Sequence, residues 1–174
     1  MDLSLVMEYK KIWILGSVAS GKTTLATKLS KLMNCYQYEL DNLVWIRRNT
    51  GDVRRTKTQI NRVLDRIYKT QSWIVEGVYR EDYNVLLEKV DIILLLNTPA
   101  HVREDRILKR WVKQRYGFEC CNYMPTVKML QSMYAWSRGY EDNYSALQEI
   151  LEPYKTKIQI VNLDGLKELL ELSY

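Results

Sequence analysis

The sequence lacks the features that mark membrane and secreted proteins. No apolar run approaches the roughly 20 residues that a membrane-spanning helix needs. The first residues do not have the order of a signal peptide, because their positive charges follow the short apolar stretch. Internal repeats, low-complexity tracts and linkers are absent too. We therefore predict one domain over residues 1–174, located in the cytoplasm and without a membrane partner.

Cysteine is scarce. Cys35, Cys120 and Cys121 are odd in number and do not have the spacing of metal ligands. We favour reduced thiols in a cytoplasmic protein. The alternative is an oxidation-sensitive pair at Cys120 and Cys121, in a segment that we expect to be mobile.

The chain also lacks a large excess of one charge: 27% of its residues are charged, but the net charge is only +5. A phosphate-binding enzyme needs inward-facing Arg and Lys, so this excess does not require nucleic acid. We favour an anionic small molecule as the ligand. A nucleic-acid partner stays open but is not favoured, because the sequence has no helix-turn-helix, zinc or other DNA-reading motif.

The chain is organised around a glycine-rich motif. Its residues match the pattern G-x-x-x-x-G-K-[ST] in full: Gly16, Ser17, Val18, Ala19, Ser20, Gly21, Lys22 and Thr23. An apolar run at 12–15 precedes the motif and a helix-forming stretch at 24–29 follows it, as a P-loop (Walker A motif) requires. The glycines let several N–H groups point at one anion, and the positive end of the following helix adds to the attraction.

The motif predicts a nucleoside-triphosphate site with ATP and Mg²⁺ as cofactors. Lys22 is expected to reach the β- and γ-phosphates, and the Thr23 hydroxyl to ligand Mg²⁺. The backbone from Gly16 onward, with Thr24 at its end, is expected to bind the nucleotide.

Strands and helices alternate along the whole chain. Short apolar runs predict five strands, at residues 11–15, 36–40, 73–77, 91–96 and 157–161. Helical spacing and cap residues predict helices at residues 22–33, 54–70, 82–89, 98–115, 126–151 and from 164 onward, with Thr98 as an N-cap before Pro99. The fold class is α/β: a three-layer P-loop NTPase fold, with a five-stranded parallel sheet, helices on both faces and a short lid at about 112–127.

Two carboxylates follow strands at the edge of the sheet where the P-loop lies. Asp41 could orient or deprotonate an acceptor or hold a water on Mg²⁺, or it could form an Asx turn. Glu76 is a candidate ligand of Mg²⁺ through water, and the alternative is a surface carboxylate. Asp91 begins its strand, so we place it at the opposite edge and give it no metal role.

Arginines are expected to neutralise the migrating phosphoryl group. Arg80 closely follows the strand that holds Glu76. Three more share one helix face: Arg103, Arg106 and Arg110. Arg115 and Arg138 flank the loop at 116–126. Each alone could be a solvated residue, but as a set they favour an arginine-lined phosphate site.

Other conspicuous side chains receive no catalytic role. His101 lies in the first turn of a helix, where a surface position is the ordinary explanation. Aromatic residues are interleaved with basic ones at Trp111, Tyr116, Tyr123, Tyr134, Trp136 and Tyr140. They could stack on single-stranded nucleic acid, but helix core and rim are the favoured interpretation.

The chain resembles the nucleoside monophosphate kinase group, of which adenylate kinase is the best known. It resembles still more closely the small family named DNA topology modulation proteins, which look like adenylate kinases with a shortened lid. The residues that carry this resemblance are the P-loop and the segments 38–45, 73–80 and 106–110.

The resemblance implies roles for individual residues. Asp41 matches the aspartate on the acceptor side, and Arg80 the arginine that binds the acceptor phosphate. Arg106 matches the arginine that packs on the donor adenine, and Arg110 the one that contacts the phosphates. Arg138 is the best match to the arginine on the helix after the lid. A further implication is that residues 162–165 form the loop that closes over the adenine.

The sequence also departs from that group. Glu76 stands where relatives have aspartate, and the loop at 116–126 holds no arginine. Residues 42–58 do not match the monophosphate-binding helices of adenylate kinases. The expected function is transfer of the γ-phosphoryl group of ATP to a small acceptor, for example a nucleoside or nucleotide. The alternatives are an ATP-switched regulator associated with nucleic acid, and a weak ATPase without a dedicated acceptor.

Overall fold

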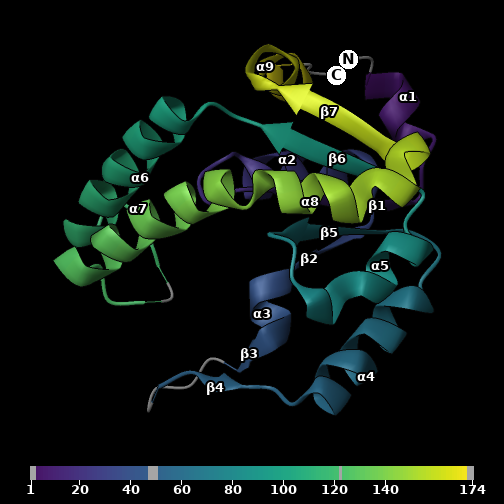
Figure 1. The fold of residues 1–174 in the computed structure, drawn as a ribbon, viewed down its shortest axis with the longest axis horizontal. Helices are drawn as coiled ribbons and strands as arrows, with labels where there is room; N and C mark the ends of the chain where they lie inside the picture. Colours follow the sequence, from purple (N-terminus) through teal and green to yellow (C-terminus); the bar gives the residue numbers. More distant parts are fainter. Residues whose placement is uncertain (1–2, 47–50, 122, 172–174) are drawn as a thin grey trace.

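The computed structural model describes residues 3–46, 51–121 and 123–171 of the chain. Its centre is a parallel sheet in the order β2-β5-β1-β6-β7, with helices on both sides (Figure 1). The strands are β1 (Lys11–Gly16), β2 (Tyr36–Glu39), β5 (Trp73–Gly77), β6 (Ile92–Asn97) and β7 (Ile158–Asn162). This confirms the predicted α/β fold with five parallel strands.

The central strands are β1, β5 and β6, and their side chains are buried on both faces. They read as continuous apolar runs, because helices cover both faces of a parallel sheet. In the register Ile14 lies opposite Glu76 on one side and Leu94 on the other. The carboxyl ends of the strands therefore meet at one edge, where both the P-loop and Glu76 lie.

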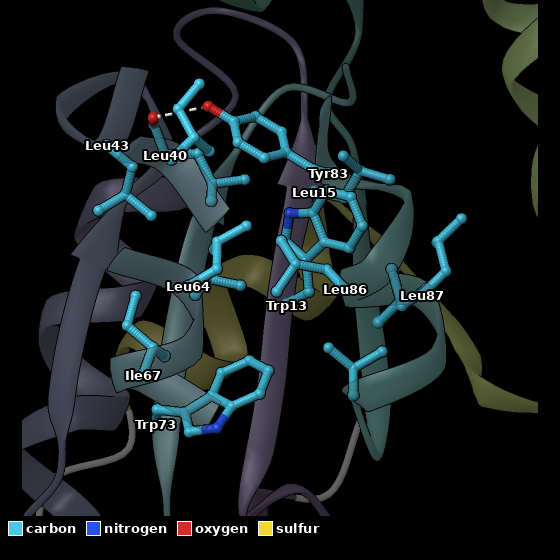
Figure 2. Close-up of a cluster of buried hydrophobic side chains, with 14 of the residues drawn as sticks. Trp13, Leu15, Leu40, Leu43, Leu64, Ile67, Trp73, Tyr83, Leu86 and Leu87 are labelled. Atoms are coloured by element: carbon cyan, nitrogen blue, oxygen red, sulfur yellow. Dashed lines mark hydrogen bonds between the residues drawn. The ribbon is translucent and has the colours of Figure 1, made fainter. Parts of the chain in front are cut away.

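One face of the sheet is covered by α1 (Leu3–Met7), α2 (Lys22–Leu32) and α9 (Leu163–Glu171). The other is covered by α3 (Leu40–Val44), α4 (Lys57–Tyr68), α5 (Asn84–Lys89) and α8 (Tyr144–Leu151). Figure 2 shows this second core, in which Trp13 of β1 lies among leucines of α3, α4 and α5. Tyr83, in the short 3-10 helix η1 (Glu81–Tyr83), donates a 2.8 Å hydrogen bond from its hydroxyl to the carbonyl of Leu40.

Two long helices extend beyond the sheet. They are α6 (Ala100–Arg115) and α7 (Val127–Asp142), which pack as a hairpin (Figure 1). The predicted lid at 112–127 covers the end of α6, the connection at 116–126 and the first residue of α7. No helix among the described residues is long and apolar enough to cross a membrane.

Several predicted boundaries were wrong. The single helix predicted at 126–151 is two helices, because Asn143 (φ −103°, ψ 10°) interrupts it and η2 (Glu152–Lys157) follows. Thr98 is not the N-cap of α6, since that position is taken by Pro99 and the Thr98 hydroxyl bonds elsewhere.

The segment between α3 and α4 contains the short hairpin of β3 (Trp45–Ile46) and β4 (Val53–Arg54). The mixed character of residues 42–52 gave no prediction for it, and residues 47–50 lie outside the described part. Arg55 Nη1 fixes the start of this hairpin by donating to the carbonyls of Asn42 (2.7 Å), Leu43 (3.1 Å) and Trp45 (3.2 Å), at the end of α3.

Candidate active site

The P-loop connects β1 to α2 as the sequence predicts. Gly21 adopts φ +106°, a conformation that favours glycine, and Ala19 next to it also has positive φ. A Cβ on Gly16 would lie 2.9 Å from Ser20 Oγ and 3.1 Å from the Leu96 carbonyl. The loop is therefore closed tightly on β6, and only glycine fits at its first position.

Two side chains in this loop are buried polar groups. Ser17 and Ser20 are at most 1% exposed, and neither hydroxyl has a hydrogen-bond partner within the structure as described. Buried polar groups are ordinarily hydrogen-bonded, so an unpartnered pair in the loop is consistent with a site that a polar ligand completes. Such a cradle of N–H groups and hydroxyls at the start of α2 fits the phosphates of a nucleotide.

The Lys22 side chain folds back over the loop. Its ammonium group donates a 2.6 Å hydrogen bond to the Ser17 carbonyl. Burial lowers the pKa of Lys22, and the carboxylates of Glu76 and Asp41 act against this shift. A desolvated ammonium group in this position gains most from an incoming phosphate, because that anion would neutralise it where water does not.

Thr23 and Glu76 form a hydrogen-bonded pair beside the P-loop. The Thr23 hydroxyl donates a 2.5 Å hydrogen bond to Glu76 Oε1. Glu76 is 6% exposed, and burial raises its pKa despite the opposing effects of Lys22 and of the Thr23 hydrogen bond. A hydroxyl and a carboxylate at this distance are hard oxygen donors of the kind that Mg²⁺ prefers, so these two side chains fit that cation.

Two side chains, one directly after β6 and one in α6, hold the P-loop in place. The Thr98 hydroxyl donates to the Ser20 carbonyl at 2.9 Å. Arg106 Nη1 donates to the carbonyls of Ser20 (3.1 Å) and Ala19 (3.3 Å). On the other side, Leu166 of α9 packs so closely that a Cβ on Gly21 would lie 2.9 Å from it. These contacts fix the loop before any ligand arrives.

An ion pair lies near Lys22 and Glu76, since the Asp41 charge acts on the pKa of both. Arg80 Nη2 and Asp41 Oδ1 form a 2.8 Å ion pair. Asp41 lies in the first turn of α3 rather than in an Asx turn, and close packing of Leu40 on Gly77 fixes that helix beside β5. A Cβ on Gly77 would lie 2.8 Å from Leu40 Cβ, which explains glycine at the end of β5.

Arg110 lies between the P-loop and the lid. Its charge reaches both Lys22 and Tyr123, the hydroxyl of which donates a 2.5 Å hydrogen bond to Gln114. The Arg110 Nη2 atom contacts Met133 Sδ at 3.8 Å, and its Nε is buried without a partner within the described residues. Arg110 thus lies near Lys22, and its predicted contact with the phosphates stays a prediction.

Arg103 is buried rather than directed into a solvent-filled site. It is 1% exposed, pairs with Glu141 of α7 at 2.5 Å, and lies over the Tyr140 ring at 5.7 Å. It is close enough to Lys22 to contribute to the lowered pKa of that residue. Its main contacts join α6 to α7.

Arg138 is placed apart from these residues. It lines an open groove between α6 and α7, with a volume of about 550 Å³, together with His101, Glu104, Asp105, Leu108, Gln131 and Tyr134. On α6 the groove residues lie on the helix face opposite Arg103, Arg106 and Arg110. The structure therefore does not bring Arg138 together with the P-loop, and its predicted role stays a prediction.

Asp91 lies at the far edge of the sheet, as expected. Its Oδ2 accepts hydrogen bonds from the backbone N–H groups of Lys10 (3.0 Å) and Lys11 (2.9 Å). It joins the beginnings of β1 and β6 and has a structural role.

Sequence reasoning missed two contributions to the site. Thr98 was interpreted as a helix cap, although its position directly after a buried strand at the P-loop edge could have indicated a contact with the loop. The role of Leu166 against Gly21 had no signal in the sequence, because it depends on how α9 packs.

The predicted loop over the adenine at 162–165 is the end of β7 and the first turn of α9, where Asn162 Oδ1 accepts a hydrogen bond from the Gly165 N–H at 2.8 Å.

Similar proteins agree with this geometry at the level of the fold. No family model matches the chain. It is 25% identical to the uncharacterized protein YqaC of Bacillus subtilis over 134 residues, which cover 76% of this chain and 74% of that protein.

Solved kinases have a similar structure. Shikimate kinase from Acinetobacter baumannii in complex with shikimate is 17% identical, with a TM-score of 0.51 over 97% of this chain and 92% of that one. The chain shares the fold of this kinase, a parallel sheet between two layers of helices. A sugar kinase from Janibacter is 22% identical, with a TM-score of 0.54 over 93% and 90% of the two chains. Deoxyadenosine kinase from M. mycoides with bound dATP is 16% identical, with a TM-score of 0.52 over 92% and 95%. At these identities the likeness concerns the fold alone.

Proposed function

We propose that this P-loop protein is an ATP- and Mg²⁺-dependent kinase that transfers the γ-phosphoryl group of ATP to a small acceptor. One observation carries the proposal: Glu76 of the Thr23–Glu76 pair and Asp41 of the Asp41–Arg80 pair both lie close enough to act on the charge of the Lys22 ammonium group. The first pair suits a metal and the second an acceptor, with the phosphate-binding loop between them. Phosphoryl transfer needs these three parts in one place.

The nucleotide side uses residues that are already in position. The N–H groups from Gly16 to Thr24 and the Lys22 ammonium group would hold the phosphates, and Arg106 would lie against the nucleoside. Thr23 would bind Mg²⁺ directly and Glu76 would do so through water. A Mg²⁺ ion held by these residues would supply positive charge that neutralises the phosphates of the nucleotide.

The acceptor side has different tasks. Asp41 would orient the acceptor and receive its proton, while Arg80 holds the Asp41 carboxylate and offers its remaining N–H groups to an anionic part of the acceptor. Arg110 would neutralise charge between donor and acceptor, and its unpartnered Nε is free to donate. Arg138 lines the groove between α6 and α7, so it could act on the phosphates only if the lid moved it towards the P-loop.

The hairpin of α6 and α7 would exclude water from the site. Water competes with the acceptor for the phosphoryl group, so exclusion decides between transfer and hydrolysis. Positioning and electrostatic stabilisation then account for the reaction, since the protein forms no covalent bond to the phosphoryl group.

The acceptor class is part of the proposal. The solved kinases of this fold are named for shikimate, sugar and deoxyadenosine, so nucleosides and small hydroxylated acids are the first candidates. The P-loop and the segments at 38–45, 73–80 and 106–110 also support kinship with the DNA topology modulation proteins. A cytoplasmic location belongs to the same proposal and fits three free thiols.

The test is ADP release from ATP and Mg²⁺ across nucleosides, nucleoside monophosphates and small hydroxylated acids. We expect one class to raise turnover at least ten-fold above hydrolysis, and Lys22→Ala to abolish that increase. Lys31→Ala is the matched control, because Lys31 is an exposed lysine on the same helix. Tight ATP binding without stimulation by any acceptor would contradict the proposal and favour the weak ATPase.

A further inference from the structure

Positive charge is concentrated at the end of the α6–α7 hairpin. Residues 109–128 hold five Lys or Arg and one Glu, a net charge of +4, whereas the whole chain has +5. Besides Lys109, three of these cations are exposed: Lys113, Arg115 and Lys128. Within the described part of the chain none of the three forms an ion pair, unlike Lys109, which pairs with Asp105 at 2.7 Å. No carboxylate among the described residues therefore neutralises these three charges.

Two aromatic rings lie among these cations. Tyr116 is 72% and Phe118 is 82% exposed, and Phe118 is the only phenylalanine in the chain. Met124 and Val127, at the start of α7, are also exposed. Grouped exposed apolar side chains on a protein surface mark interaction sites more often than single ones do. We call Lys113, Arg115, Tyr116, Phe118 and Lys128 the hairpin tip.

We propose that the hairpin tip binds single-stranded nucleic acid. Non-specific binding of single strands combines cations that track the phosphates with aromatic side chains on which bases stack. The hairpin tip offers both within one short stretch, since Arg115 and Tyr116 are neighbours and Phe118 follows. Of the six aromatic residues that suggested stacking in the sequence, only Tyr116 and Trp136 are exposed, so the surface is smaller than the sequence indicated.

Other partners fit the hairpin tip less well. A second copy of the chain would bring like charges together, which opposes association through this surface. A lipid surface needs a broad apolar face along a helix, whereas the exposed Val112 in the last turn of α6 is next to the cation Lys113 and close to the cation Arg115. Single-stranded nucleic acid offers phosphates to the cations of the hairpin tip and planar bases to its aromatic rings.

The hairpin tip is separate from the phosphate site although the same helix carries both. From Arg106, which contacts the P-loop, to Arg115 the rise along α6 is about 14 Å. We therefore expect binding at the hairpin tip not to depend on Lys22, and a substitution at one site to leave binding at the other unchanged. This inference goes beyond the proposed kinase activity and does not rest on it.

The test is fluorescence anisotropy with a labelled single-stranded DNA or RNA of about 12 nucleotides, which lies within the usual site size. We expect binding that weakens as salt rises, with the same affinity in Lys22→Ala. In Lys113→Gln/Arg115→Gln the slope of log K against log salt should fall by about 1.4, because each phosphate that is no longer neutralised lowers the slope by about 0.7. Arg62→Gln/Arg66→Gln on α4 is the matched control, because both arginines are exposed and remote from the hairpin tip.

The rings have a matched control as well. Tyr116→Ala and Phe118→Ala should each weaken binding about ten-fold. Tyr36→Ala should leave it unchanged, because Tyr36 is 74% exposed but begins β2 at the opposite edge of the sheet. All of these side chains are exposed, so the melting temperatures of the variants should match that of the wild-type protein.

Three results would overturn the inference. The first is absence of binding to single strands at low salt, or equal loss of binding in the hairpin-tip and control variants. The second is binding of phosphatidylserine vesicles, but not of the oligonucleotide, that the hairpin-tip variants lose. The third is a dimer in solution that Phe118→Ala dissociates.

Discussion

The Thr23 hydroxyl donates a 2.5 Å hydrogen bond to Glu76, from the first turn of α2 to the end of β5. Glu76 is nearly buried, and its pKa is raised chiefly by that burial. Without a cation the ionised carboxylate is therefore disfavoured at this position. A buried carboxylate with a raised pKa contributes little to the stability of the fold, but it could bind a metal ion. We therefore infer that Glu76 serves function rather than stability.

We predict that Glu76→Gln raises stability at neutral pH and removes the response to Mg²⁺. The pKa of Glu76 is higher in the folded than in the unfolded state, so folding favours the protonated form. The cost of ionisation is present above the folded pKa and disappears as pH falls through it. The melting temperature of Glu76→Gln should exceed that of the wild-type protein at pH 7.5, by a few degrees for about 1 kcal/mol, and the gap should close as pH falls through the folded-state pKa of Glu76.

Metal dependence separates this prediction from simple stabilisation. ATP with Mg²⁺ should raise the melting temperature of the wild-type protein more than ATP with EDTA, and Glu76→Gln should lose that difference. Glu39→Gln is a control on the neighbouring strand β2, since Glu39 pairs in register with Glu76. A Glu76→Gln protein that responds fully to Mg²⁺ would remove Glu76 from the metal site.

Thr98→Val should weaken ATP binding although Thr98 lies behind the P-loop. Its hydroxyl donates to the Ser20 carbonyl at 2.9 Å, and valine has the same shape without the donor. Loss of about 1 kcal/mol from one hydrogen bond corresponds to about a five-fold higher Kd for ATP. Thr70→Val is the control, because the Thr70 hydroxyl makes a similar bond to the Ile67 carbonyl, at 2.7 Å and away from the site. Equal Kd values in titration calorimetry for Thr98→Val and the wild-type protein would show that the loop does not need this contact.

The sequence was sufficient for the sheet and for the P-loop because both depend on local patterns. Short runs rich in apolar and aromatic residues identified all five strands of the sheet, and the glycine spacing identified the loop. Glu76 and Asp41 could be placed because parallel strands end at one edge. Contacts between helices could not be predicted in this way: Arg103 shares a face with Arg106 in sequence, yet packing of α7 buries Arg103 against Tyr140.

The hairpin of β3 and β4 shows the same limit. Its strands are only two residues long, so alternation gives too little signal to identify them. Arg55 holds the start of the hairpin through three carbonyls, and nothing in the sequence marks it out from the other arginines.

Arg80→Gln should impair use of the acceptor without affecting ATP. Arg80 holds Asp41 at 2.8 Å, so its loss would free the carboxylate that orients the acceptor. We expect kcat/KM for the acceptor to fall about 100-fold, a loss of about 3 kcal/mol in transition-state stabilisation, while the Kd for ATP stays unchanged. Arg54→Gln is the matched control, because it breaks a similar exposed ion pair, with Asp82 at 3.0 Å. A rise in the Kd for ATP in Arg80→Gln alone would assign Arg80 to the nucleotide side.

Glu141→Ala should destabilise the hairpin of α6 and α7, because it leaves the guanidinium group of Arg103 unpaired at 1% exposure. Loss of one partner of a fully buried pair costs about 3–5 kcal/mol, and the half-exposed position of Glu141 reduces this to about 2 kcal/mol. The double variant Arg103→Met/Glu141→Ala removes the charge as well and should recover part of the loss. Glu152→Ala, which breaks the exposed pair with Lys155, should change the free energy of unfolding by less than about 0.5 kcal/mol. Urea titrations would measure all four proteins, and a double variant less stable than Glu141→Ala would show that Arg103 stabilises the hairpin by packing on Tyr140 rather than through its ion pair.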